Sequence, residues 1–433
     1  MECMKVKKWI FSFISDSLFR NSFYLVANSI IGSLAGFVFW FLAARLYTAG
    51  DIGLASTIIS TTGLIALISN LGFSISLIRF LSDLKEEARN LINSCFTVSA
   101  SISCIISVIF VLEVEIFSPA LSIIRSNIIY AAIFILFSIL TIISSLQNSI
   151  FVGYRKVNLS FFKIAIENST KIPILFYFIA YGSYGIIASY AIAYIVSILI
   201  ALLILIPKVN AKYLPIPIVD LHIMKGIFHY SAGNYIAGIL EIMPNFVLPI
   251  IITNMLNTEM TAYFYITWMI AGIIFMIPNS IATSLFAEGS SNEAELTQNI
   301  RKYLKFTILL VVSVIVVIFF EGEKMLMLYG NEYSVNGEKL LWSLAISVIP
   351  MTFNNIYIAM KRVQKNINAV ILANLMITGI TLLVSLFTIK ILGILGVGIG
   401  WLVSQVITNI YIYMSHRGFL NSIKLKITST FFH

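Results

Sequence analysis

Twelve long apolar segments constrain the fold of this 433-residue sequence more than any other feature. A helix that crosses the hydrocarbon core of a bilayer needs about 20 apolar residues at a rise of about 1.5 Å each. The pattern therefore predicts an all-α integral membrane protein with twelve transmembrane helices. We place these helices at residues 21–46, 52–79, 91–113, 127–152, 157–179, 185–206, 226–253, 261–287, 303–320, 338–360, 366–389 and 393–414.

The composition excludes most other classes of protein. Hydrophobic residues make up 59% of the chain and charged residues only 11%, with a mean hydropathy of +0.96. A soluble domain is typically about 25% charged, so soluble enzymes and nucleic-acid-binding proteins are excluded. The net charge of +9 then indicates topology and contact with anionic lipid headgroups. The odd set of cysteines, Cys3, Cys95 and Cys104, predicts neither a disulfide framework nor a metal site, and we expect no cofactor.

The distribution of lysine and arginine predicts the orientation in the membrane. With the amino terminus inside, 21 of the 28 basic residues fall in cytoplasmic segments and only 5 in external ones. Cytoplasmic loops of membrane proteins carry this excess. We therefore expect a multi-pass protein of the cytoplasmic membrane with both termini in the cytoplasm. Residues 1–20 lack a signal-peptide cleavage site, so we expect a retained interfacial lead-in.

Short internal similarities predict two halves. Asn148–Arg155 is similar to Asn355–Arg362, and Gly182–Gly185 is similar to Gly393–Gly396, at a nearly constant separation. Each half would begin and end in the cytoplasm, which makes the repeat parallel, about an axis along the membrane normal. The predicted order is a lead-in (1–20), an N-terminal six-helix lobe (21–206), a cytoplasmic interlobe linker (207–225), a C-terminal six-helix lobe (226–414) and a cytoplasmic tail (415–433).

Two pairs of glycines have the spacing of close helix contacts. Gly32 and Gly36 lie in the first predicted helix, and Gly396 and Gly400 lie in the last. This spacing lets two helices approach closely, so we expect both pairs to serve packing.

Two short motifs resemble a known family. Ala43-Ala44-Arg45-Leu46, followed by Gly50-Asp51-Ile52-Gly53-Leu54, resembles the exit of the first helix in oligosaccharide flippases of the multidrug/oligosaccharidyl-lipid/polysaccharide exporter superfamily. Gly153-Tyr154-Arg155-Lys156 resembles the basic turn after the fourth helix of that family. The resemblance implies alternating access by two lobes. It also implies outward movement of a polyprenyl-diphosphate-linked oligosaccharide for a surface polysaccharide such as O-antigen, with membrane lipids and other polysaccharide-assembly membrane proteins as partners.

The fifth predicted helix contains three charged residues, Lys163, Glu167 and Lys171. Their i, i+4, i+8 spacing places them on one helical face. Ionisable residues within a membrane are costly and indicate a functional site by default. Two ammonium groups and one carboxylate would suit a diphosphate headgroup. The alternative is a set of charges that neutralise one another and serve only the structure.

The seventh predicted helix contains Glu241, Asn234 and Asn245, together with Pro244 and Pro249. The two prolines predict a bent or broken helix. Desolvation favours a neutral carboxyl group, so Glu241 could bind a proton near neutral pH and couple transport to H⁺, or else to Na⁺. The alternative is a structural hydrogen bond to a neighbouring helix.

Two other functions remain open at this point. A cation-coupled multidrug exporter of the same fold would prefer acidic residues in its cavity, and the two lysines of the fifth helix argue against it. A polytopic glycan polymerase or glycosyltransferase would need catalytic residues gathered in a sizeable external domain, and the predicted external loops are short. We therefore expect no catalytic residues. The chain has no phosphate-binding loop of the Gly-Lys-Ser/Thr type, which excludes an ATP-driven pump within it.

Overall fold

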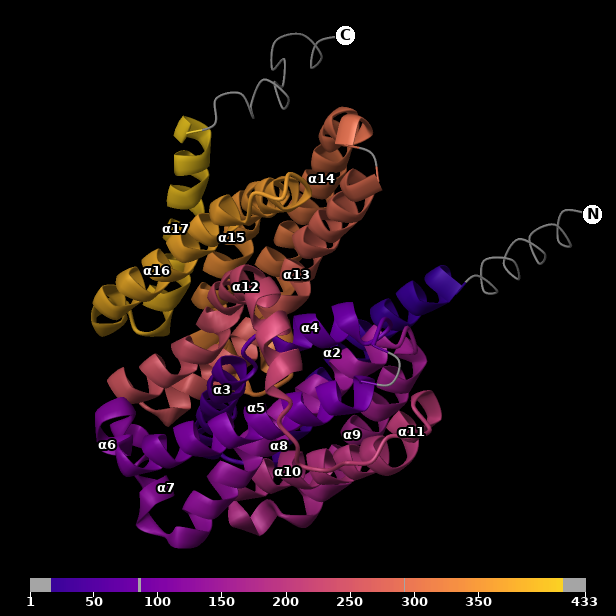
Figure 1. Cartoon of the computed structure of the whole chain (residues 1–433). Coiled ribbons are helices and arrows are strands. Elements are labelled where there is room, and N and C mark those ends of the chain that lie inside the picture. Colours follow the sequence, from indigo (N-terminus) through magenta and orange to yellow (C-terminus); the bar gives the residue numbers. More distant parts are fainter. Residues whose placement is uncertain (1–16, 85–86, 292, 416–433) are drawn as a thin grey trace, which may run out of the picture. The chain divides into compact units, whose positions relative to one another are not determined.

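Helices form almost all of the described structure (Figure 1). The computed structural model describes residues 17–84, 87–291 and 293–415. Its long helices are α2 (Ser17–Leu46), α3 (Ala49–Ser69), α5 (Ala88–Leu112), α8 (Ile128–Gly153), α9 (Val157–Tyr177), α10 (Ser183–Ile200), α12 (Leu221–Met255), α13 (Thr258–Ser291), α14 (Glu293–Met327), α15 (Asn331–Val363), α16 (Ile367–Leu392) and α17 (Ile394–Ser415). The short elements are α4 (Phe73–Phe80), α6 (Val114–Phe117), α7 (Ile123–Ser126) and α11 (Ile206–Val209), two 3₁₀ turns, η1 (Pro119–Leu121) and η2 (Ile179–Tyr181), and the π-helical turn η3 (Ala201–Leu205).

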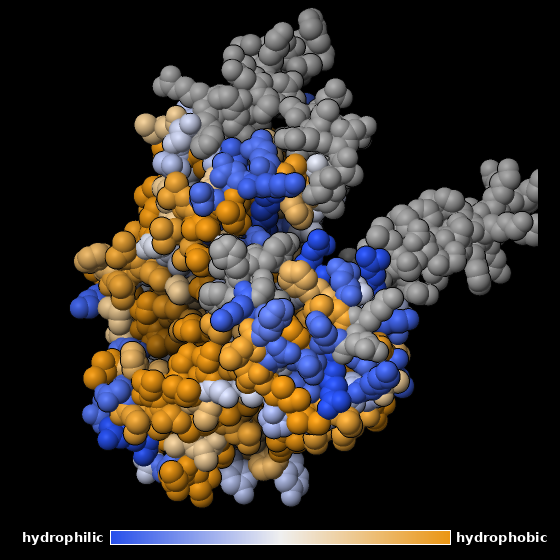
Figure 2. Space-filling view, viewed as in Figure 1, coloured by the Kyte–Doolittle hydropathy of each residue, from blue (hydrophilic) through white to orange (hydrophobic). Residues whose placement is uncertain are grey.

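Nine helical segments within the described ranges are long and apolar enough to cross a membrane. They lie in α3, α5, α8, α10 with the two turns that follow it, α12, α13, α15, α16 and α17. Figure 2 shows that hydrophobic residues cover much of the visible surface. Several large apolar side chains are exposed, among them Ile105 at 58%, Phe387 at 77% and Ile391 at 83%. Such a surface suits lipid rather than water, as expected for a multi-pass membrane protein. That α2, α9 and α14 also cross, which would give twelve spans, stays a prediction.

The predicted second span, residues 52–79, is two helices rather than one. The first of them, α3, ends at Ser69, and α4 begins at Phe73. Leu71 and Gly72 between them have φ angles of 48° and 82°. Glycine adopts this left-handed conformation without steric cost, and a helix cannot continue through it. A hydropathy pattern does not reveal such a break, because the sequence remains apolar on both sides of it.

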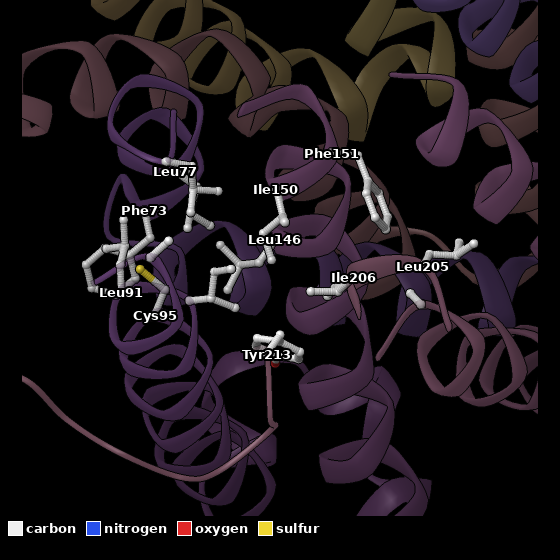
Figure 3. Packing of buried hydrophobic residues seen from close by; sticks show 14 of the residues in the cluster. Phe73, Leu77, Leu91, Cys95, Leu146, Ile150, Phe151, Leu205, Ile206 and Tyr213 are labelled. Carbon is white, nitrogen blue, oxygen red and sulfur yellow. The ribbon is translucent and has the colours of Figure 1, made fainter. Parts of the chain in front are cut away.

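The first compact unit comprises residues Met1–Tyr235. In it, α9 packs against α10 and α2, and α8 packs against α3, α4 and α5. Figure 3 shows its buried apolar cluster, in which Phe73 and Leu77 of α4, Leu91 of α5 and Leu146 of α8 converge. Tyr213, from the segment that precedes α12, is 3% exposed and belongs to the same cluster.

The segment before α12 is attached to this unit by hydrogen bonds as well. Asn93 Nδ2 donates to the carbonyl of Leu214 at 2.9 Å, and the Asp220 amide donates to Ser94 Oγ at 2.9 Å. The division between the two units falls within α12, after Tyr235. The predicted linker, 207–225, thus lies within the first unit, and its role between two lobes stays a prediction.

The second compact unit comprises Ile236–His433. Its central helix is α15, which packs against α13, α14 and α17, while α16 packs mainly on α17. A small buried cluster of Leu285, Leu304, Ile356 and Ala359 joins α13, α14 and α15. Of the predicted terminal segments, residues 1–16 of the lead-in and 416–433 of the tail lie outside the described residues, and α2 already begins at Ser17.

Several local geometries recur in the two units. The second residue after α8 and the second residue after α15, Arg155 and Lys365, both have a φ of 55° although neither is glycine. The turns before α10 and α17 contain Gly182 and Gly393, with φ of 55° and 58°. Two buried amides also make matching bonds, each spanning 51 positions. Gln147 donates to the carbonyl of Ile198, and Asn354 donates to the carbonyl of Gln405.

The two glycine pairs differ from each other. A Cβ added at Gly396 would lie 2.6 Å from the carbonyl oxygen of Thr388, and one at Gly400 would lie 3.0 Å from that of Thr381. This pair therefore lets α17 approach α16 closely, as predicted. At Gly32 and Gly36 an added Cβ would meet no atom of the described residues within 4 Å. A packing role for this pair stays a prediction, because the spacing permits a close contact without supplying a partner among the described residues.

Candidate functional site

A buried ion pair lies in the middle of α9. Lys163 Nζ is 3.4 Å from Glu167 Oε2 and donates a hydrogen bond of 2.6 Å to Ser144 Oγ on α8. Ser144 donates in turn to Glu167 Oε2 at 3.3 Å. The Lys163 side chain is 0% exposed and that of Glu167 is 17% exposed. The spacing of four places both on one helical face, and the hydroxyl of α8 completes a closed triad.

Lys171, one turn further along α9, has a different environment. Its Nζ lies 4.8 Å from the ring centre of Phe39 on α2 and 4.5 Å from that of Tyr190 on α10. The residue is only 5% exposed. A desolvated ammonium over two ring faces is stabilised by their negative electrostatic potential. The three predicted site residues therefore lie together on α9, with one carboxylate for two ammonium groups.

The end of α9 that lies beyond Lys171 is fixed by the turn between α2 and α3. Tyr47 Oη donates to the carbonyl of Leu175 at 2.7 Å, and Asp51 Oδ1 accepts from the Ser183 amide at 2.9 Å. Burial, and next the charge of Asp51, raise the pKa of Tyr47 to about 12. Tyr47 is therefore a neutral donor at physiological pH. The family motif around Asp51 has a structural role here, because it ties α3 to the start of α10.

A cavity of about 440 Å³ lies in the second unit. Glu241 and Arg362 form an ion pair at its wall, 2.8 Å apart, with side chains 51% and 39% exposed. Asn245 lines the same cavity and accepts a hydrogen bond of 3.1 Å from Trp268 Nε1. Asn234, the third residue predicted for this helix, is exposed and falls in the first unit. The cavity lining thus includes two of the three predicted residues, Glu241 and Asn245.

The α12 helix runs unbroken through Pro244 and Pro249, so a broken helix is ruled out, whereas the alternative of a bent helix stays a prediction. Proline at 244 cannot donate to the carbonyl of Leu240, four residues earlier. Thr378 Oγ1 of α16 donates to that carbonyl instead. On the same face, Asn374 Nδ2 donates to the carbonyl of Ala237 at 2.9 Å. The side chain of Thr378 therefore satisfies the carbonyl that Pro244 leaves without a donor, and that of Asn374 adds a second bond one turn away.

Sequence reasoning missed several residues of these sites. From the sequence alone, Arg362 counts only as one of the basic loop residues that determine topology. No local pattern connects it with Glu241, which lies 121 positions away in the sequence. Ser144, Trp268 and Trp401 carry no charge and lie within apolar helices. A usable signal was the set of amides in apolar segments, among them Asn279 and Asn355, which bond to each other at 2.7 Å in the cavity wall.

Comparison with known proteins places the chain in a family. The family model described as "Polysaccharide biosynthesis protein" matches residues 18–287, more than half of the chain. The chain belongs to this polysaccharide biosynthesis protein family. The match includes α9 with its three charged residues and ends within α13, so all cavity-lining residues of α15, α16 and α17 lie beyond it. No curated protein matches this family member at the level of sequence.

Solved structures with the same fold are transporters and a flippase. The lipid II flippase MurJ, in an inward closed conformation, has a TM-score of 0.74 at 13% identity, covering 90% of this family member and 87% of MurJ. An inward-facing multidrug resistance transporter of the MATE family, from the MOP superfamily, has a TM-score of 0.68 at 16% identity. The match covers 90% of this family member and 96% of the transporter. A MOP superfamily transporter from Pyrococcus furiosus has a TM-score of 0.61 at 16% identity. The match covers 95% of this family member and 96% of that transporter. These structures therefore share their fold with this family member.

Proposed function

We propose that this protein is a flippase that moves a polyprenyl-diphosphate-linked oligosaccharide from the cytoplasmic to the outer leaflet by alternating access, for the synthesis of a surface polysaccharide. The observation that carries the proposal is the presence of two buried lysines, Lys163 and Lys171, beside the single carboxylate of Glu167 in the first unit. A buried net positive charge is costly unless an anion visits it. A diphosphate is such an anion, and family membership supports this substrate class.

The proposed architecture is twelve transmembrane helices in two lobes of six, 21–206 and 226–414, related by a parallel repeat. The recurring geometry at Arg155 and Lys365, and at Gly182 and Gly393, supports the repeat. Left-handed φ angles at non-glycine residues are uncommon, so their occurrence at matching turns favours a common origin of the halves. The excess of basic residues on one side supports cytoplasmic termini and a linker at 207–225 on that side.

In this proposal Lys163 and Lys171 bind the diphosphate in succession while Glu167 sets their spacing. Both lysines are buried in the present conformation, so the substrate would reach them only after the helices around α9 separate. Alternating access supplies that separation. The competing interpretation, charges that only stabilise one another, fits the closed triad of Lys163, Glu167 and Ser144 equally well.

The triple variant Lys163→Leu, Glu167→Leu, Lys171→Leu separates the two interpretations. We would reconstitute it in liposomes and measure translocation of a fluorescent polyprenyl-diphosphate-linked sugar, after confirming normal membrane abundance. We expect loss of translocation. The matched control, Lys163→Leu with Glu167→Leu, removes an ion pair without changing the net charge and should retain part of the activity. Normal translocation by the triple variant would overturn the role of the lysines.

A multidrug exporter is the second candidate, because a MATE transporter shares the fold and Glu241 lines a cavity with aromatic residues. In either function we propose that Glu241 couples transport to H⁺ or Na⁺, which would require its bond to Arg362 to open. Glu241→Gln mimics the protonated state and should abolish the dependence of transport on the proton gradient. An unchanged dependence would leave Glu241 with a structural role only.

A further inference from the structure

The cavity of the second unit has a chemical character that the proposed function does not yet use. Its volume of about 440 Å³ lies within the roughly 300–1,000 Å³ of small-molecule sites. Four aromatic residues, Trp268, Phe275, Phe286 and Trp401, contribute to its wall. Trp268 and Trp401 have ring centres 5.2 Å apart at an interplanar angle of 76°, and Phe275 lies 5.8 Å from each of them. The cavity thus has an aromatic wall of fixed geometry.

Five residues that line this cavity carry neutral amides, namely Asn245, Asn279, Asn355, Asn374 and Gln405. Asn245 is bonded to Trp268, and Asn355 donates to Asn279. Each amide group carries two donors and an acceptor with two lone pairs, so these single bonds use only part of its capacity. The side chains of Asn245 and Asn279 are exposed toward the cavity space. They can therefore exchange hydrogen bonds with a ligand that both donates and accepts.

The charged groups of the cavity cancel each other. Glu241 and Arg362 are 2.8 Å apart, so the wall presents both signs of charge with no net excess. A cationic drug would need an unpaired carboxylate, and a diphosphate would need an unpaired cation. A neutral ligand rich in hydroxyl groups meets neither obstacle. Hydroxyl groups can bond the carboxylate, the guanidinium and the amides at once, while the faintly positive C–H faces of a sugar ring suit the negative faces of the aromatic rings.

We propose that this cavity is a sugar-binding subsite, which recognises a neutral hexose or N-acetylhexosamine unit of the glycan. The proposal rests on the function proposed above. The sugar would bind the aromatic and amide wall formed within the second unit by α12, α13, α15, α16 and α17. Selection among sugars would then depend on the second unit, through Asn245, Asn279 and Asn355.

The test uses the purified full-length protein in detergent and saturation-transfer NMR with methyl glycosides of glucose, galactose, N-acetylglucosamine and N-acetylgalactosamine at millimolar concentrations. We expect transfer to the ring protons of at least one glycoside. Trp268→Leu should weaken that binding by roughly tenfold, whereas Trp268→Phe should retain part of it. Trp342→Phe is the matched control, because Trp342 stacks on Phe319 and does not line the cavity.

The outcomes separate this proposal from the proposed function. No transfer to any glycoside, or equal transfer in Trp268→Leu, would overturn the sugar subsite while the translocation assay still decides the flippase. Binding of tetraphenylphosphonium in competition with the glycosides would also overturn it, in favour of a cation site. Glycoside binding without any translocation would leave the subsite in place and remove the flippase.

Discussion

At the scale of single residues, the two lysines of α9 have different surroundings inside the protein. Lys163 has a carboxylate at 3.4 Å and a hydroxyl at 2.6 Å, which together replace its hydration shell. Lys171 lies between two aromatic rings. The Lys171 ammonium is thus surrounded by ring faces, which attract a cation without neutralising it, so it is the better placed of the two to meet an anion.

The contribution of the aromatic rings at Lys171 can be measured. Phe39→Leu should lower the free energy of unfolding by about 2 kcal/mol more than in a background that carries Lys171→Met, because a desolvated cation–π contact is worth about that much. Unfolding in detergent by added dodecyl sulfate, with the four proteins of the double-mutant cycle, gives the coupling. A coupling near zero would mean that Phe39 contributes only its apolar volume.

At the scale of helices, Pro244 shows how α12 keeps its course. The proline frees the carbonyl of Leu240, and Thr378 of α16 donates to it. The bond therefore joins α12 and α16 at the point where α12 lacks one of its own backbone hydrogen bonds. This contact also holds α12 beside α16. The next residue of α12, Glu241, lies in the cavity wall.

Removing that hydroxyl should be costly. Thr378→Val should lower the free energy of unfolding by about 1–3 kcal/mol, because it leaves a carbonyl without a partner inside the protein. Thr170→Val is the control, since among the described residues Thr170 bonds only to the carbonyl of Ile166 on its own helix. Its effect should stay near zero. Equal effects of the two changes in the same unfolding assay would show that Leu240 finds another donor.

The two glycine pairs offer a second test at this scale. Gly396→Ala would bring a methyl group to 2.6 Å from the Thr388 carbonyl, so we expect a loss of about 1–3 kcal/mol. Gly36→Ala meets no described atom within 4 Å and should be neutral, or stabilising by up to about 1 kcal/mol through helix propensity. Thermal unfolding in detergent compares the two directly. A loss of stability in Gly36→Ala would reveal a contact at that position.

At the scale of the whole molecule, the orientation in the membrane is the property that transport depends on most. Charge-sensitive insertion predicts that segments rich in lysine and arginine remain inside. Reporter fusions after Lys212 and after Arg417 should therefore report the cytoplasm, and one after Asn331 should report the outside. A cytoplasmic signal after Asn331 would contradict the twelve-span topology, because it would require a different number of crossings before α15.

The sequence by itself determined that this protein belongs in a membrane, and it determined the local placement of the charged residues. Hydropathy depends on composition along one segment, and the four-residue spacing of Lys163 and Glu167 depends only on the helix that carries them. The same local reasoning found Gly396 but could not find the break at Gly72, since a left-handed φ leaves no trace in hydropathy. The tertiary structure alone decided that Arg362 pairs with Glu241, that Ser144 closes the triad on Lys163, and that Trp268 and Trp401 face one cavity. Each of these contacts joins different helices, and the rotation and packing that bring such helices together are properties of the whole fold rather than of any segment.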